Sequence, residues 1–118
     1  MYKCKYPNLF SPIVLAGTLF RNRIFAAPTG VFYADPAHRP INETMSYYER
    51  KAKGGAGSVC VGDAMVDSEH GVHGAYAMLM EDKGLMPALN RLASQINRHG
   101  AVATLEMFHA GSASSVSY

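Results

Sequence analysis

The feature that most constrains the fold is an alternation of strand-like and helix-like segments. Three short apolar runs favour strands at residues 23–28, 58–61 and 101–108, and two stretches between them favour helices. Each strand-like run is closed by glycine, proline or aspartate, which are typical of turns. Helical crossovers join neighbouring parallel strands, so this order predicts an α/β fold with three adjacent parallel strands and two helices.

Both helices carry their own start or stop signals. Asn42 is expected to cap the first helix, which runs from Glu43 to about Lys53. Gly54 and Gly55 are expected to end it, because glycine tolerates the left-handed conformation found after helices. The second helix is marked by an apolar stripe at helical spacing, made up of Leu85, Leu89, Leu92 and Ile96, with His99 and Gly100 at its end.

A β-hairpin is predicted before the first strand. Residues 9–15 and 18–20 flank Ala16 and Gly17, and such a hairpin is suited to plugging one end of a barrel. The order of elements fits a doubly wound sheet or a (β/α)8 barrel. A barrel needs about 250 residues, so these 118 residues would supply about three of its eight strands.

Composition argues against several classes of partner. The net charge is +2 and the basic residues are scattered, which disfavours nucleic acid. No apolar run approaches the ~20 residues that span a membrane, and we expect a cytoplasmic protein. Cys4 and Cys60 have no metal-ligand or redox-motif spacing and are expected to be free thiols. The group Glu69, His70 and His73 is interpreted as a solvated loop, without a metal.

Residues that contact ligands in parallel α/β folds lie where strands end. Three such points are Pro28-Thr29-Gly30, Gly62-Asp63 and the segment from Glu106 to Gly111, and a long connection from Gly62 to about Asp82 follows the second strand. Taken singly, each point is also an ordinary turn signal. The alternatives of a ligand site and a simple turn therefore stay open on the residues alone.

Four motifs, in order and in register, resemble one family. They are Leu9-Phe10-Ser11-Pro12, Asn22-Arg23-Ile24 with Ala27-Pro28, the stretch from Tyr48 to Gly57, and Phe108-His109-Ala110-Gly111. Together they resemble the NADH:flavin oxidoreductase / old yellow enzyme family over nearly the whole chain. The branch with dienoyl-CoA reductase, enoate reductase and bile-acid-modifying enzymes is the most similar. The resemblance implies a TIM barrel with FMN at the C-terminal ends of its strands, of which residues 1–118 form an incomplete domain, the N-terminal third.

The resemblance also implies which residues contact FMN. Pro28, Thr29 and Gly30 match the segment that touches the isoalloxazine ring, and Gly30 stands where many members carry Cys, Thr or His. Asp63 matches a small-residue position beside the polar edge of the flavin. Glu106 matches a position commonly held by Gln, and a carboxylate accepts hydrogen bonds but does not donate them.

Several aromatic and polar residues outside these flavin contacts have more than one possible role. Phe32, Tyr33 and Asp35 match substrate-facing positions, with ordinary loop packing as the alternative. His109 orients the neighbouring loop, packs structurally or contacts the ligand, and these alternatives stay open. Tyr47 and Tyr48 are interpreted as packing residues of the first helix.

The implied activity is hydride transfer from NADH or NADPH, through FMN, to an activated alkene of the enone or enoyl-CoA type. The catalytic residues and phosphate-binding loops of the family come from later strands, so none is assigned here, and an iron–sulfur cluster in a C-terminal part is a further implication. The 118 residues alone are expected to bind FMN weakly or not at all and to be inactive. The unpaired edge beyond the third strand is expected to make the isolated residues self-associate. The alternatives are a different flavin- or phosphate-binding barrel and a non-catalytic, truncated α/β fragment or module that associates with another chain.

Overall fold

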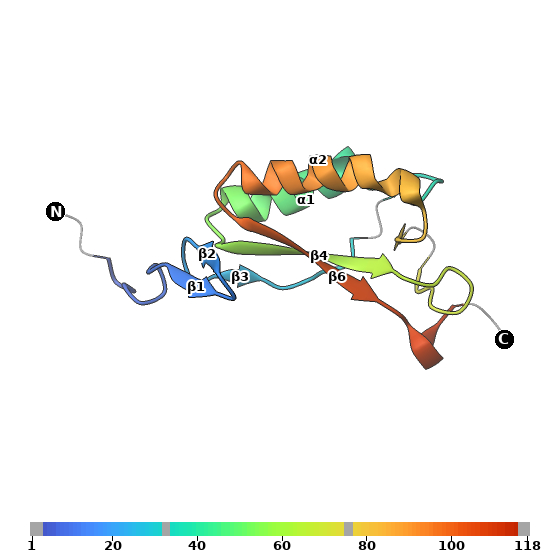
Figure 1. Ribbon diagram of the computed structural model, residues 1–118, viewed down its shortest axis with the longest axis horizontal. Helices are drawn as coiled ribbons and strands as arrows, with labels where there is room; N and C mark the ends of the chain where they lie inside the picture. The colour runs from blue at the N-terminus through green and yellow to red at the C-terminus, as the bar shows by residue number, and fades with distance from the viewer. Residues whose placement is uncertain (1–3, 32–33, 75–76, 116–118) are drawn as a thin grey trace.

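The fold of the computed structural model is a parallel sheet with two helices packed on one face (Figure 1). The structure describes residues 4–31, 34–74 and 77–115. The sheet strands are β3 (Phe25–Ala26), β4 (Ser58–Met65), β5 (Met78–Leu79) and β6 (Val102–Phe108), and the helices are α1 (Asn42–Lys53) and α2 (Met86–Asn97). The predicted order of three parallel strands joined by helical crossovers is confirmed.

Strand β4 lies at the centre of the sheet. It pairs in parallel with β3, Phe25 opposite Ser58, and on its other side with β6, Ser58 opposite Val102. The short strand β5, which the sequence did not predict, pairs with the C-terminal end of β4. The carboxyl ends of β4 and β6 therefore lie next to one another, with Met65 opposite Phe108. Strand β3 ends earlier, opposite Val59.

In the part of the chain that the structure describes, helices cover only one face of the sheet (Figure 1). Val59 and Val61 of β4 point toward the helices, where Leu92 and Ile96 of the predicted stripe are fully buried. Successive strand residues point to opposite faces, so the other face carries residues such as Phe25, which is 49% exposed, and the exposed Thr104. One buried and one bare face is the expected state of strands taken from a barrel.

Two strand boundaries differ from the prediction. The second strand does not stop at Val61 but continues to Met65. It passes through an irregularity, because Val61 pairs with Leu105 whereas Ala64 pairs with Met107. Two residues of β4, Gly62 and Asp63, thus oppose one residue of β6. The glycine and aspartate that suggested a turn instead form a bulge, which uses the same backbone freedom without ending the strand. The first strand is shorter than predicted.

The C-terminal end of α1 agrees with the prediction, but its N-terminal end does not. Asn42 is the first residue of α1 and not its cap, because Ile41 holds the extended N-cap conformation and no side chain caps the helix. At the other end, Gly54 is the C-cap and Gly55 has φ +112°, as the glycine pair predicted. Helix α2 follows a 3-10 turn (Lys83–Leu85) that Asp82 caps through the backbone N–H of Gly84.

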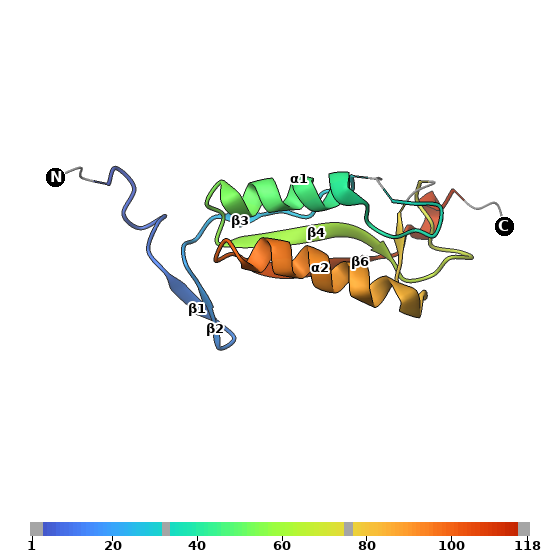
Figure 2. The same cartoon turned by 90° about the horizontal axis from the view of Figure 1, so that it is seen from above.

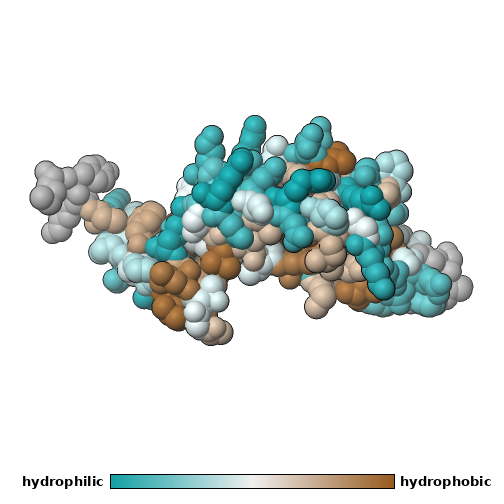
Figure 3. Space-filling model, turned by 45° about the horizontal axis from the view of Figure 1, so that its top comes forward, coloured by the Kyte–Doolittle hydropathy of each residue, from teal (hydrophilic) through white to brown (hydrophobic). Residues whose placement is uncertain are grey.

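The predicted hairpin is present as β1 (Ile13–Leu15) and β2 (Thr18–Phe20). Ala16 and Gly17 both have positive φ, which fits the twist of a tight hairpin turn. The hairpin projects from the sheet in Figure 2, and Figure 3 shows hydrophobic side chains gathered over it. Val14 and Leu19 are more than half exposed. Apolar residues so exposed are suited to covering another apolar surface.

Two polar residues after the hairpin join it to the body. The Arg21 guanidinium donates hydrogen bonds to the carbonyls of Ala52 (2.7 Å) and Ala56 (2.8 Å). The buried Asn22 amide donates to the Gly55 carbonyl at 2.7 Å, and its oxygen accepts from the backbone N–H of Ile24 at 3.0 Å. These contacts fix the turn between α1 and β4. Within the described residues, no helix is long and apolar enough to cross a membrane.

Candidate functional site

The predicted site residues of three separate segments are brought to neighbouring strand ends. Thr29 lies shortly after β3, Asp63 lies in the bulge of β4, and Glu106 of β6 stands opposite that bulge. Pro28 and Thr29 are exposed, whereas Gly30, Asp63 and Glu106 are partly buried. The fold therefore places all five residues at one end of one sheet.

The segment after β3 touches the bulge of β4 through its backbone. A Cβ atom built on Gly62 would lie 2.6 Å from the backbone nitrogen of Thr29 and 2.8 Å from its carbonyl carbon. Real Cβ atoms do not approach backbone atoms so closely, so this position requires glycine. The contact brings the segment after β3 within reach of Asp63, the next residue of the bulge.

A buried phenol hydroxyl bridges the same two strand ends. The Tyr48 hydroxyl of α1 donates a hydrogen bond to the Thr29 carbonyl at 2.6 Å and accepts one from the backbone N–H of Gly62 at 3.0 Å. Burial raises the pKa of Tyr48 to about 12, and the hydrogen bond from Gly62 opposes that rise. The hydroxyl therefore stays protonated and donates throughout the physiological range.

Asp63 and Glu106 supply the acidic groups of this end of the sheet. Asp63 has φ +57°, a left-handed conformation that aspartate adopts more readily than most residues. Glu106 points to the bare face, since its neighbour Leu105 packs against the core on the helix side. The Glu106 carboxylate makes no hydrogen bond or ion pair with any residue that the structure describes, so its acceptor oxygens are available to a ligand.

A cation lies beside Thr29 on the helix side. The Lys51 ammonium is 3.4 Å from the Thr29 hydroxyl and 4.5 Å from the centre of the Tyr47 ring. The hydrogen bond with Lys51 lowers the pKa of Tyr47. Lys51 therefore adds positive charge near one of the predicted ligand contacts.

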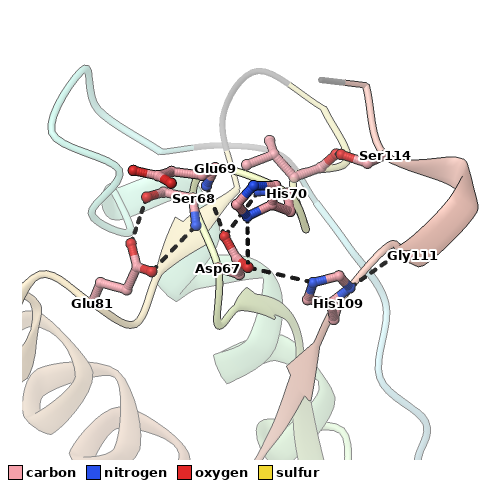
Figure 4. Close-up of polar contacts among 9 residues, drawn as sticks. Asp67, Ser68, Glu69, His70, Glu81, His109, Gly111 and Ser114 are labelled. Carbon is pink, nitrogen blue, oxygen red and sulfur yellow. Dashed lines mark hydrogen bonds and ion pairs between the residues drawn. The ribbon is translucent and has the colours of Figure 1, made fainter. Parts of the chain in front are cut away.

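His109 ties the end of β6 to the loop after β4 (Figure 4). Its Nδ1 accepts a hydrogen bond from the Gly111 N–H, which leaves Nε2 facing the Asp67 carboxylate at 3.6 Å. Asp67 also accepts from the backbone N–H groups of His70 and Glu69, each at 2.9 Å. The backbone N–H of His70 is the main cause of the lowered pKa of Asp67. Of the three roles open to His109, which are loop orientation, structural packing and ligand contact, this geometry matches orientation of the loop.

The structure places the remaining predicted residues as follows. Phe32 and Tyr33 lie outside the described residues. The Asp35 carboxylate is taken up by its own turn, where it accepts from the N–H groups of Ala37 and Arg39. No group of three metal-ligating side chains occurs among the described residues. Cys4 and Cys60 are free thiols.

Sequence reasoning missed two residues that shape this end of the sheet. Tyr48 was interpreted as a packing residue, and it is fully buried as expected, but its hydroxyl also joins two strands. The available signal was that a buried tyrosine hydroxyl needs a polar partner. Asp67 was not singled out, although its spacing to His70 is typical of an aspartate that hydrogen-bonds the backbone of its own turn.

The chain matches a known family and several known proteins. A family model described as the NADH:flavin oxidoreductase / NADH oxidase family matches residues 8–118. The NADH oxidase of Thermoanaerobacter brockii is 28% identical over 106 residues, which are 90% of this chain and 16% of that protein. The metal reductase of Desulforamulus reducens is 32% identical over 104 residues, 87% of this chain and 15% of that protein. The chain thus spans about a sixth of these relatives.

Solved structures agree with the predicted fold. A 2-naphthoyl-CoA reductase in complex with 2-naphthoyl-CoA matches with a TM-score of 0.83 at 28% identity, over 92% of this chain and 16% of that one. The old yellow enzyme from Trypanosoma cruzi matches with a TM-score of 0.83 at 24% identity, over 94% of this chain and 29% of that one. The predicted fold, the N-terminal part of a TIM barrel, is confirmed.

Proposed function

Because the chain belongs to the NADH:flavin oxidoreductase / NADH oxidase family, we propose that it forms one wall of the FMN site of a cytoplasmic NAD(P)H-dependent oxidoreductase. The observation that carries the proposal is that Thr29 and Glu106 flank the Gly62–Asp63 bulge of β4 on its two sides, toward the C-terminal end of β4. That end is where ligands bind in folds of this kind. Both cysteines are free thiols, as is usual in the cytoplasm.

The residues at this end fit a flavin ring system. Gly30 carries no side chain and is only partly buried, and Glu106 presents a carboxylate without a protein partner among the described residues. Pro28, Thr29 and Gly30 would contact the ring, while Asp63 and Glu106 would face its polar edge. When bound, FMN accepts hydride from a nicotinamide and passes it to a second substrate.

The protein residues have separate tasks in this proposal. The Glu106 oxygens accept a hydrogen bond from a ring N–H group and thereby orient the ring. The same carboxylate disfavours negative charge on the ring, which lowers the tendency of the cofactor to be reduced. Gly30 offers no side chain to the ring, so the redox balance depends more heavily on Glu106 and Asp63 than in relatives with a polar or sulfur-containing residue there.

For the second substrate we propose an activated alkene conjugated to a carbonyl or thioester, of the enone or enoyl-CoA class. The support is the likeness to a 2-naphthoyl-CoA reductase, whose structure contains an unsaturated thioester of coenzyme A. That likeness extends over 92% of this chain. The groups that bind the carbonyl and deliver the proton would come from further strands of the barrel.

The test is purification of the complete polypeptide encoded by the reading frame. We expect about one FMN for each polypeptide, bleaching of the flavin absorbance by NADH or NADPH without oxygen, and recovery of the absorbance on addition of 2-cyclohexenone or crotonyl-CoA. Iron and acid-labile sulfide, assayed in the same preparation, decide whether the iron–sulfur cluster implied by the resemblance accompanies FMN. A colourless polypeptide that takes up no FMN would contradict the proposal.

A further inference from the structure

We infer that Tyr48 is a positioning residue for the FMN site and that its hydroxyl sets the spacing between the segment after β3 and the bulge of β4. The inference rests on the proposed function, because it concerns the geometry of that same site. It assigns a role to a side chain that lies on a helix outside the sheet and lines no part of the bare face.

The first step concerns the point where two strands part. Regular pairing between β3 and β4 is limited to Phe25 with Ser58 and Ala26 with Val59. Beyond it, the N–H of Gly62 is buried and needs an acceptor. The Tyr48 hydroxyl provides that acceptor and uses its own hydrogen to bond the Thr29 carbonyl. One phenol oxygen thus replaces a direct bond between the strands.

The second step concerns how firmly the hydroxyl is held. Tyr48 has no exposed surface, and it lies in the middle of α1 with its ring edge-on to Tyr47, 5.1 Å between ring centres. The hydroxyl makes both bonds within ordinary hydrogen-bond distance. A rigid helix therefore transmits its position to the sheet through two short contacts.

The third step connects the hydroxyl to the site. Its two partners are the carbonyl of Thr29 and the amide that directly precedes Asp63. Asp63 holds φ +57°, a conformation that persists only where the surrounding structure fixes it. Loss of the hydroxyl would release both residues together, and with them two of the predicted ring contacts.

The variant Tyr48→Phe tests this role in the complete polypeptide. It keeps the ring and removes only the oxygen, so the N–H of Gly62 loses its acceptor. The matched control is Ser58→Ala, which also removes one buried hydroxyl. The Ser58 hydroxyl donates to the Val102 carbonyl of the neighbouring strand at 3.0 Å, but it lies at the N-terminal end of β4, away from the site. Both variants are expected to fold, with similar falls in melting temperature.

The expected result is specific to Tyr48→Phe. Its FMN dissociation constant rises about tenfold, the size expected when one ordinary hydrogen bond is lost, and its flavin absorption maxima shift. Ser58→Ala keeps the wild-type constant and spectrum. If Tyr48→Phe folds and binds FMN with the wild-type constant and spectrum, or if both variants change equally, the inference is overturned while the proposed function stands. If the wild type binds no FMN, the proposed function fails and the inference fails with it.

Discussion

Gly62 of β4 lies directly against the backbone of Thr29, with no room between them for a side chain. The Cβ atom of any other residue would fall 2.6 Å from the Thr29 nitrogen. Thr29 and Asp63, which follows Gly62 in the bulge, are both predicted to contact the flavin, so the same backbone contact serves folding and ligand binding. Substitutions here should change both properties.

The variant Gly62→Ala is expected to destabilise the protein by about 2 kcal/mol, since one added methyl group must push two backbones apart. Urea unfolding of the complete polypeptide measures the change. FMN affinity should fall in the same variant, because the displaced atoms belong to Thr29. The control is Gly54→Ala, at a glycine with an ordinary helical φ of −69°, where the expected change is below about 1 kcal/mol. Equal effects of the two substitutions would contradict the close contact.

Asn22 holds the turn between α1 and β4 through two side-chain hydrogen bonds. Asn22→Ala leaves the Gly55 carbonyl and the Ile24 N–H without these partners in a largely buried place. We expect a loss of roughly 2 to 3 kcal/mol in unfolding free energy. Asn90→Ala, on the exposed side of α2, should change stability by less than about 0.5 kcal/mol. Chemical denaturation of both variants under one condition checks the difference.

Glu49 links the two helices, because its carboxylate contacts His99 at 2.8 Å and also pairs with Arg98. The hydrogen bonds from His99 and then Arg98 lower the pKa of Glu49. A carboxyl group with a lowered folded pKa stabilises the protein above its unfolded pKa, about 4.3, and loses that contribution as the pH falls through the folded value.

Glu49→Gln should therefore be less stable than the wild type at pH 7, and the two proteins should converge as the pH falls below about 4. Melting temperatures measured across the acid range show the convergence. The control is Glu69→Gln, at an exposed loop residue. Its melting temperature should differ from that of the wild type by the same amount at every pH. A constant gap between Glu49→Gln and the wild type would refute the proposed linkage.

Glu106→Gln tests the electrostatic role of the carboxylate on the bare face. Removal of a negative charge near the ring should stabilise the reduced flavin and raise its midpoint potential, by on the order of 30 mV for a two-electron couple, which corresponds to about 1.4 kcal/mol. Glu49→Gln removes the same negative charge on helix α1 and should leave the midpoint potential of the flavin unchanged. Reductive titration with a reference dye gives both values.

Residues 1–118 produced alone should self-associate. In the described part of the chain β6 pairs only with β4, and an apolar groove of about 130 Å³ lies between α2 and the sheet. Unpaired strand edges beside apolar surface favour pairing with other chains. Met107→Lys, at a residue 71% exposed on that strand, should reduce the association. Sedimentation velocity at several concentrations would show a simple monomer if this prediction is wrong.

The types and order of the helices and longer strands were predictable because they depend on local patterns, whereas the two-residue strand β5 was not. The stripe from Leu85 to Ile96 and the glycine pair after Lys53 each determine a feature within one element. The bulge at Gly62 and Asp63 was not predictable, since the same two residues suit a turn and a bulge. The choice between them depends on the pairing of Ala64 with Met107, a contact distant in sequence.

The candidate site was predictable to the level of strand ends but not of contacts. Positions such as Thr29 and Glu106 follow from where strands stop in a parallel sheet. The bridge by Tyr48 depends on how α1 packs across two strands, and the contact between Asp67 and His109 depends on how a loop folds back. Neither arrangement is encoded in a local pattern.

Amide hydrogen exchange of the complete polypeptide, measured by mass spectrometry with and without FMN, tests the central claim most directly. If the ends of β3, β4 and β6 form a wall of the flavin site, bound FMN will slow exchange in peptides covering residues 29–31, 61–65 and 104–109. Peptides from the outer surface of α2 will exchange at the same rate in both states. Saturation with FMN that leaves all three strand-end peptides unchanged would contradict the claim.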